Sequence, residues 1–216
     1  GAVAFDLPDD IAPMGRFVIV DEYEISGGGI ILEDLEDPQT WVRDKLYLRE
    51  TKWEKSGISQ EQRTEKYNQR ATLILITGKK DIGKKPLARS LEARLFGDGR
   101  IVYFMNIGNV LYGVDADIKG RNNNRQEHLR RLSEVAHIMI EAGIILILTA
   151  IELTQEDIDL IKAIINPDKI EVIWIGDEVT TNVAYDLHFP DVADLGQSSH
   201  RVKRMLQEKG IIYKPL

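Results

Sequence analysis

The sequence predicts an α/β fold in which helices flank a parallel β-sheet, preceded by a short β-ribbon. Three observations support this prediction. From residue 72 onward, short β-rich runs alternate with segments of helical periodicity, as in βαβ units. The run at 73–76 is apolar on both faces, which is typical of a strand buried inside a parallel sheet. Glycines follow this run directly, and a helical pattern follows the glycines.

The residue pattern in the first part of the chain predicts the β-ribbon. Strand patterns cover residues 16–20 and 23–32, with a turn at Asp21 and Glu22 between them. Two strands are too few to build a hydrophobic core, so their apolar side chains need cover from elsewhere. No helix follows the glycine run at 27–29, so we interpret it as a flexible or bulged strand rather than a phosphate loop.

The rest of the chain predicts a connecting segment and a globular domain. A helix is expected from Ser59 to about Gln69, because Ser59 and Gln62 can form a capping box. Further strands are expected at 72–77, 101–105, 144–150 and 170–175, and further helices at 86–96, 125–142, 154–165 and 199–208. The expected divisions are a barrel remnant at 1–35, a connecting segment at 36–70 and an α/β domain at 71–216.

Composition excludes several classes of function. With 216 residues, 43% of them hydrophobic, the chain can form one substantial core plus a small appendage. A net charge of −7 argues against nucleic acid as the main partner, since duplex binding needs a basic surface. No apolar run approaches the roughly 20 residues that cross a bilayer and no signal-peptide pattern is present, so we expect no membrane partner and a cytoplasmic location. The chain has no cysteine and its four histidines lack metal-ligand spacing, so no metal site is expected.

Gly78, Gly83 and Lys84 match the pattern G-x-x-x-x-G-K of a phosphate-binding loop, or P-loop. The glycines permit a turn whose amide hydrogens converge on phosphate oxygens, and the next helix points its N-terminus at the same place. The pattern then requires Ser or Thr as a ligand of Mg²⁺, but Lys85 and Pro86 follow, and an ammonium group cannot coordinate a cation. We therefore expect the loop to bind a nucleotide or a phosphate or sulfate anion, with a solvated lysine turn as the alternative. The expected phosphate-binding residues are Gly78, Asp81, Ile82, Gly83, Lys84 and Lys85.

Three segments carry a resemblance to a known family. They are the loop at 78–85, residues 106–114 in place of the family's D-G-D-N-V-R-x-G-L, and residues 124–131 in place of its D-R-x-E-N-I-R-R. Through them, residues 52–216 resemble adenylyl-sulfate kinase, the P-loop enzyme that phosphorylates the ribose 3′-hydroxyl of adenylyl sulfate with ATP. Residues 15–19 and 27–30 resemble the last strands of the elongation-factor-Tu-like barrel that ends the large subunit of sulfate adenylyltransferase. The resemblance implies ATP as a ligand, a fragment of a fused sulfate-activation protein, a homodimer, and the remaining sulfate adenylyltransferase subunits as partners.

The resemblance also shows which family groups are replaced. The two acidic residues of D-G-D-N are Asn106 and Gly108 here, and the arginine that recognises the sulfonucleotide is Leu111. The aromatic residue that stacks on the substrate base falls at Arg121, and the basic lid expected after Ile175 is deleted. We therefore assign no catalytic residue, and we expect ligand binding to depend little on Mg²⁺.

The candidate substrate-binding residues implied by the family segments are Asn109, Arg125 and His128. Arg125 is expected either to contact a nucleotide or to pair within the chain. His128 stands in place of the family's asparagine, and we expect it on a polar helix surface rather than as a catalytic base. Asp115 and Asp117 could approach a metal ion, but a solvated loop is the simpler expectation.

Three functions remain open at this point. The favoured one is a catalytically degenerate adenylyl-sulfate-kinase-like domain that serves as a nucleotide- or anion-binding, regulatory or interaction module. The second is a working kinase of adenylyl sulfate or a related nucleotide with rearranged catalytic groups. The third is a purely structural oligomerisation domain.

Overall fold

The structure is a computed structural model that describes residues 15–21, 23–31, 49, 51–116 and 125–213. The chain forms two compact units, residues 1–41 and 42–216, and each is considered by itself. The expectations for Asp117 and Arg121 lie outside the described residues.

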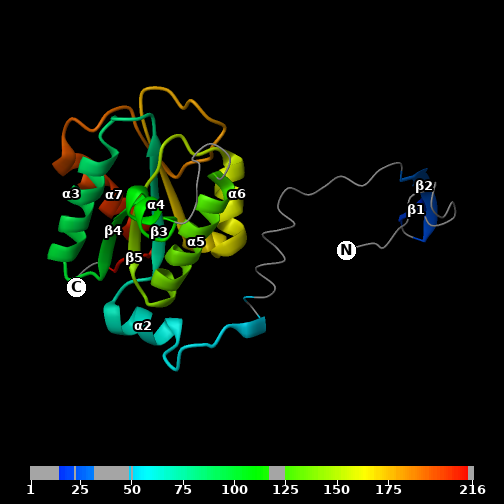
Figure 1. Cartoon of the computed structure of the whole chain (residues 1–216), viewed down its shortest axis with the longest axis horizontal. Coiled ribbons are helices and arrows are strands. Elements are labelled where there is room, and N and C mark those ends of the chain that lie inside the picture. Colours follow the sequence, from blue (N-terminus) through cyan, green and yellow to red (C-terminus); the bar gives the residue numbers. More distant parts are fainter. Residues whose placement is uncertain (1–14, 22, 32–48, 50, 117–124, 214–216) are drawn as a thin grey trace. The chain divides into compact units, whose positions relative to one another are not determined.

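The larger unit contains a five-stranded parallel sheet between two layers of helices (Figure 1). Its strand order is β4-β5-β3-β6-β7, and every neighbouring pair is parallel. Helices α3 and α7 pack together on one face of the sheet, and α5 and α6 pack together on the other. The strands are β3 (Thr72–Gly78), β4 (Val102–Asn106), β5 (Ile145–Thr149), β6 (Ile170–Ile175) and β7 (Leu187–Phe189). The helices are α3 (Lys84–Gly97), α5 (Arg125–Glu141), α6 (Gln155–Ile164) and α7 (Leu195–Glu208). The predicted α/β fold is confirmed.

Strand β3 lies at the centre of the sheet and all seven of its residues are buried. Ile74 and Ile76 of β3 pack in one core cluster with Leu87 and Leu91 of α3. Burying each such side chain contributes about 1.5–3 kcal/mol, so the joint between β3 and α3 is strongly fixed. This packing holds the loop at 78–83 at the carboxyl end of the central strand, as predicted.

Helix α2 (Gln60–Tyr67) has the predicted capping box. The Ser59 hydroxyl accepts a hydrogen bond from the Gln62 amide, and the Gln62 side chain accepts one from the Ser59 amide. Helix α4 (Ile107–Tyr112), the 3-10 turn η1 (Pro167–Lys169) and the three-residue strand β7 were not predicted, because such short elements show too few periods of a pattern. Within the described ranges, every helix is too short or too polar to cross a membrane.

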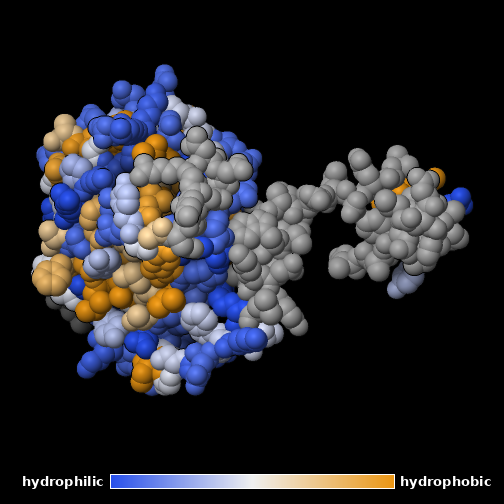
Figure 2. All heavy atoms as spheres, viewed as in Figure 1, coloured by the Kyte–Doolittle hydropathy of each residue, from blue (hydrophilic) through white to orange (hydrophobic). Residues whose placement is uncertain are grey.

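The β4 end of the sheet carries exposed apolar side chains. Figure 2 shows apolar residues gathered over this end, between α3 and α5. Tyr103 of β4 and Ile138 of α5 are both exposed. The Glu92 carboxylate of α3 accepts a hydrogen bond of 2.7 Å from the Phe104 amide of β4. A charged side chain therefore covers this strand edge, which opposes pairing with a strand of another molecule.

The ribbon in the smaller unit consists of β1 (Arg16–Asp21) and β2 (Glu24–Ile30), paired antiparallel. The register shifts between Ile19 and Val20, so that Ser26 is skipped and the bulge lies just before the glycine run. The glycines at 27–29 themselves pair in regular register with residues 17–19. A Cβ atom added at Gly29 would lie 2.6 Å from Cζ of Phe17. The glycine therefore makes room for the phenyl ring.

Lys209, just after α7, holds two carboxylates together. Its Nζ lies 2.5 Å from Oε2 of Glu171 and 2.6 Å from Oδ1 of Asp186. Burial raises the pKa of Glu171, and the hydrogen bond from Lys209 opposes that shift. Replacing Lys209 with methionine is expected to lower the free energy of unfolding by about 1–3 kcal/mol, because the buried Glu171 carboxylate loses its donor. Urea denaturation measures this loss.

The matched control for this prediction is Arg204→Met on α7. Arg204 pairs with Glu208 at 3.5 Å, but both side chains are largely exposed. Exposed pairs contribute little, so this variant should change the free energy of unfolding by less than about 0.5 kcal/mol. Equal losses in the two variants would contradict the assignment of Lys209.

Candidate functional site

The loop between β3 and α3 requires glycine at the two positions that the motif specifies. Gly78 has a φ of 138° and Gly83 a φ of 94°, conformations that side chains rarely adopt. A Cβ atom on Gly78 would lie 2.1 Å from the carbonyl oxygen of Ile175 in the neighbouring strand. Asp81, between the two glycines, has a φ of 59°. The chain thus forms the tight turn of a phosphate-binding loop.

Lys84 is buried under this loop. Its ammonium donates a hydrogen bond of 2.8 Å to the carbonyl oxygen of Gly78 and another to that of Lys79. Burial lowers the pKa of Lys84, while the charges of Asp81 and Glu152 oppose this shift. An ammonium group has three hydrogens. Two of these three hydrogens are therefore used within the loop itself.

The other lysines of the loop lie at the surface. Lys79, Lys80 and Lys85 are exposed. Beside the loop is a cavity of ≈ 380 Å³ lined by residues 80–86 and Ile151. Its lining includes the predicted residues Asp81, Ile82, Gly83, Lys84 and Lys85.

Arg125, at the start of α5, pairs within the chain. Its Nη2 lies 2.6 Å from Oδ2 of Asp157 and its Nε lies 3.2 Å from Oδ1, which makes a two-point contact. This hydrogen bond raises the pKa of Arg125. Asp157 also forms the capping box of α6 with Thr154. Of the two expectations for Arg125, the structure shows the pairing within the chain.

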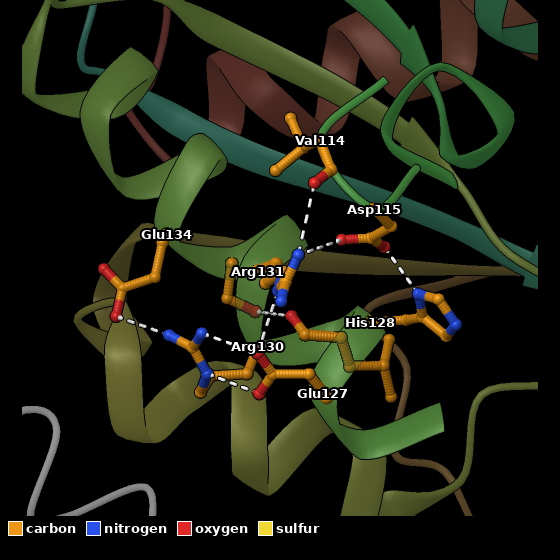
Figure 3. A network of polar contacts seen from close by, with 9 residues as sticks. Val114, Asp115, Glu127, His128, Arg130, Arg131 and Glu134 are labelled. Atoms are coloured by element: carbon orange, nitrogen blue, oxygen red, sulfur yellow. Dashed lines mark hydrogen bonds and ion pairs between the residues drawn. The ribbon is translucent and has the colours of Figure 1, made fainter. Parts of the chain in front are cut away.

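The buried Asp115 pairs with His128, which is partly buried (Figure 3). Nδ1 of His128 lies 2.5 Å from Oδ2 of Asp115, whose side chain is 0% exposed. Nη1 of Arg131 lies 3.8 Å from Oδ1 of Asp115 and donates to the carbonyl oxygen of Val114 at 3.2 Å. The expectations of a solvated loop for Asp115 and of a polar helix surface for His128 are wrong, because α4 and the turn after it pack against α5.

The same region of α5 carries a chain of ion pairs, visible in Figure 3. Glu127 accepts hydrogen bonds from Arg130 and Arg131, each at 2.8 Å. Nη1 of Arg130 also lies 3.8 Å from Oε1 of Glu134. The arginines of α5 are therefore bound to carboxylates of the chain itself, whereas Asn109 lies exposed on α4.

Comparison with known proteins identifies the family. The family model for adenylylsulphate kinase matches residues 70–188, which is more than half of the chain. The chain belongs to this family. The adenylyl-sulfate kinase of Clostridium kluyveri is 32% identical over 120 residues, which cover 56% of this chain and 60% of that protein.

Two further relatives add to this picture. The bifunctional enzyme NodQ of Rhizobium sp. is 28% identical over 151 residues, covering 69% of this chain and 22% of NodQ. The Mycobacterium tuberculosis APS kinase CysC in complex with AMPPNP and APS has the same fold, with a TM-score of 0.56 at 20% identity. The match covers 64% of this chain and 99% of that one. The chain spans about 60% of the length of its curated Clostridium relative.

Three positions differ from the groups that the resemblance assigns to Mg²⁺ binding in the family. Lys85 stands in place of the hydroxyl, and Asn106 and Gly108 stand in place of the carboxylates. Across the part of the chain that the structure describes, no group of three or more His, Asp or Glu residues is arranged to hold a metal ion.

The segment after β6, where the family has a lid, is bonded to the start of α6. The Thr181 hydroxyl donates to the carbonyl oxygen of Leu153 at 2.7 Å, and the Gln155 amide donates to Oδ1 of Asn182 at 2.9 Å. Hydrogen bonds thus fix this segment to the start of α6, and residues 176–178 of it line a pocket together with Lys79 and Ile82 of the phosphate-binding loop.

Glu152 is a neighbour of the loop that the sequence reasoning did not single out. Its amide donates a hydrogen bond of 3.1 Å to the carbonyl oxygen of Gly78, the same oxygen that accepts from Lys84. Glu152 follows β5, which pairs with β3, and the carboxyl ends of neighbouring parallel strands share one edge. An acidic residue three positions after the end of that strand was the signal that could have identified it.

Proposed function

We propose that this chain is a nucleotide- or anion-binding domain of a sulfate-activation protein, in which the adenylyl-sulfate kinase activity of its family is degenerate. One observation carries the proposal. The loop at 78–85 keeps its glycines and its buried Lys84, whereas Lys85, Asn106 and Gly108 replace the groups around Mg²⁺. Phosphoryl transfer depends on positioned charges around the moving group, so catalysis is lost before binding. A domain that binds a nucleotide or anion without converting it would serve a regulatory or interaction role.

Calorimetric titration with ATP tests this proposal. We expect ATP to bind more weakly than to an intact P-loop, with little dependence on Mg²⁺. Lys84→Met should weaken binding by about 10- to 100-fold, because it removes a charged hydrogen-bond donor. The control Lys66→Met, at an exposed side chain in the last turn of α2, should change the affinity by less than about twofold.

Two results would contradict the proposal. One is tight ATP binding that strictly needs Mg²⁺, which would mean that other groups hold the metal ion. The other is no binding of ATP or inorganic phosphate, which would favour the purely structural domain with Lys84 kept on the carbonyl oxygens of Gly78 and Lys79.

A second candidate, a working kinase with rearranged groups, is favoured by the contact between Asp115 and His128. A carboxylate on Nδ1 orients an imidazole so that Nε2 is available as a base, the arrangement found in many catalytic triads. A 3′-phosphorylated product formed by the purified chain, and lost in His128→Asn, would favour this candidate.

We also propose a homodimer and an association with sulfate adenylyltransferase. Residues 1–35 would be the remnant of an elongation-factor-Tu-like barrel, joined by residues 36–70 to the kinase-like domain at 71–216. NodQ, a relative of this chain, is bifunctional by name. The two strands of the ribbon leave Ile19 and Ile25 exposed, so they need cover. Sedimentation of a monomer at micromolar concentration would contradict the homodimer.

A further inference from the structure

Glu152 is held in an uncommon backbone conformation beside the phosphate-binding loop. Its φ is 42°, in the left-handed region that few residues other than glycine occupy. Hydrogen bonds fix it at three points: its amide donates to Gly78, its carbonyl accepts from Nη2 of Arg125 at 3.4 Å, and its Oε1 accepts from the Thr180 hydroxyl at 2.7 Å. Strained residues that their surroundings hold in place occur often at functional sites.

The backbone of Glu152 lies close to the cation of the loop, and the charge of its carboxylate acts on the pKa of Lys84. The carbonyl oxygen of Gly78 accepts from the Glu152 amide at 3.1 Å and from the Lys84 ammonium at 2.8 Å, so these two nitrogen atoms lie within about 6 Å of each other. Asp81 also acts on Lys84, but its side chain is 87% exposed and free to turn into solvent. Thr180 holds the Glu152 carboxylate in place.

An anion on the loop would therefore lie near a fixed negative charge. The loop amides, the start of α3 and Lys84 attract the anion, and Glu152 repels it with a strength that grows with the charge of the anion. We propose that Glu152 limits the charge of the group that the loop holds, so that a singly charged oxyanion such as a sulfate group is preferred over a doubly charged terminal phosphate. This inference rests on the proposed binding function of the loop.

ADP and adenylyl sulfate form a matched pair of probes. The two have nearly the same shape, but at pH 8 the terminal phosphate of ADP carries two charges and the terminal sulfate of adenylyl sulfate carries one. In calorimetry without divalent cations, we expect wild-type protein to bind adenylyl sulfate at least about fivefold more tightly than ADP. Glu152→Gln should tighten ADP binding by about 10-fold and adenylyl sulfate binding by only about 3-fold.

Two controls separate local charge from other effects. Glu156→Gln, on the exposed first turn of α6, makes the same change in net charge and should keep the wild-type preference. Raising the NaCl concentration of wild-type protein from about 50 to 500 mM should shrink the preference, since salt screens the repulsion. The salt measurement uses wild-type protein alone, so it does not depend on how a variant folds. The glutamine of Glu152→Gln keeps a side-chain oxygen that can accept the hydrogen bond from Thr180.

The outcomes distinguish this inference from the proposed function. ADP binding that appears only in Glu152→Gln would support the inference. If wild-type protein binds both probes and Glu152→Gln leaves the preference unchanged, the inference is wrong while the binding function stands. If neither wild-type protein nor Glu152→Gln binds either probe, the binding function and the inference both fail.

Discussion

Replacing His128 with leucine is expected to lower the free energy of unfolding by about 3–5 kcal/mol. The Asp115 side chain is fully buried, and its Oδ2 lies 2.5 Å from Nδ1 of His128. Oδ1 of Asp115 has no hydrogen-bond partner among the described residues, and Nη1 of Arg131 is 3.8 Å away. Leucine would fill the space of the imidazole but leave the carboxylate buried without a hydrogen bond. Only the long ion pair with Arg131 would then offset the lost hydration of the carboxylate.

Guanidinium denaturation followed by circular dichroism measures this effect. The control His200→Leu changes an exposed histidine of α7 and should shift the free energy of unfolding by less than about 0.5 kcal/mol. The double variant Asp115→Leu and His128→Leu should lose less stability than His128→Leu alone, because it removes the buried charge together with its partner. Equal stability of His128→Leu and wild-type protein would show that the pair does not stabilise the fold.

The purified chain is expected to phosphorylate adenylyl sulfate far more slowly than about 1 per second, the lower end for working kinases. Removing one group that stabilises transition-state charge commonly costs about 10²- to 10³-fold in rate. Here Lys85 replaces the hydroxyl and Asn106 and Gly108 replace the carboxylates. Lys85→Ser should therefore not restore activity, because groups that act as a unit are not repaired one at a time.

A coupled assay that follows the 3′-phosphorylated product tests this prediction. The adenylyl-sulfate kinase of Clostridium kluyveri, a relative of this chain, serves as the positive control under the same conditions. Turnover near 1 per second or faster would contradict the proposal that the kinase activity of this chain is degenerate. Loss of that turnover in His128→Asn, with the fold intact, would then assign the base to the pair of His128 and Asp115.

Local patterns in the sequence determined the architecture of this protein. Three local features fix the backbone over a few neighbouring residues each. They are the apolar run of β3, the glycines at 78 and 83, and the capping box at Ser59. Backbone conformation and periodic burial depend on such short-range features, so they can be predicted without knowing how distant segments pack. The position of the phosphate-binding loop and the burial of its strand followed from these features alone.

Only the tertiary structure decided which polar groups of distant segments meet. His128 of α5 contacts Asp115, which follows α4, and Arg125 of α5 contacts Asp157 of α6. The amide of Glu152, which follows β5, donates to the carbonyl oxygen of Gly78 at the end of β3. Each contact joins residues that are 13 to 74 positions apart. Whether a carboxylate is solvated or paired depends on which segments pack over it. The sequence near Asp115 or Glu152 does not predict that packing. The electrostatics of the site therefore come from long-range packing, whereas its backbone shape comes from local sequence.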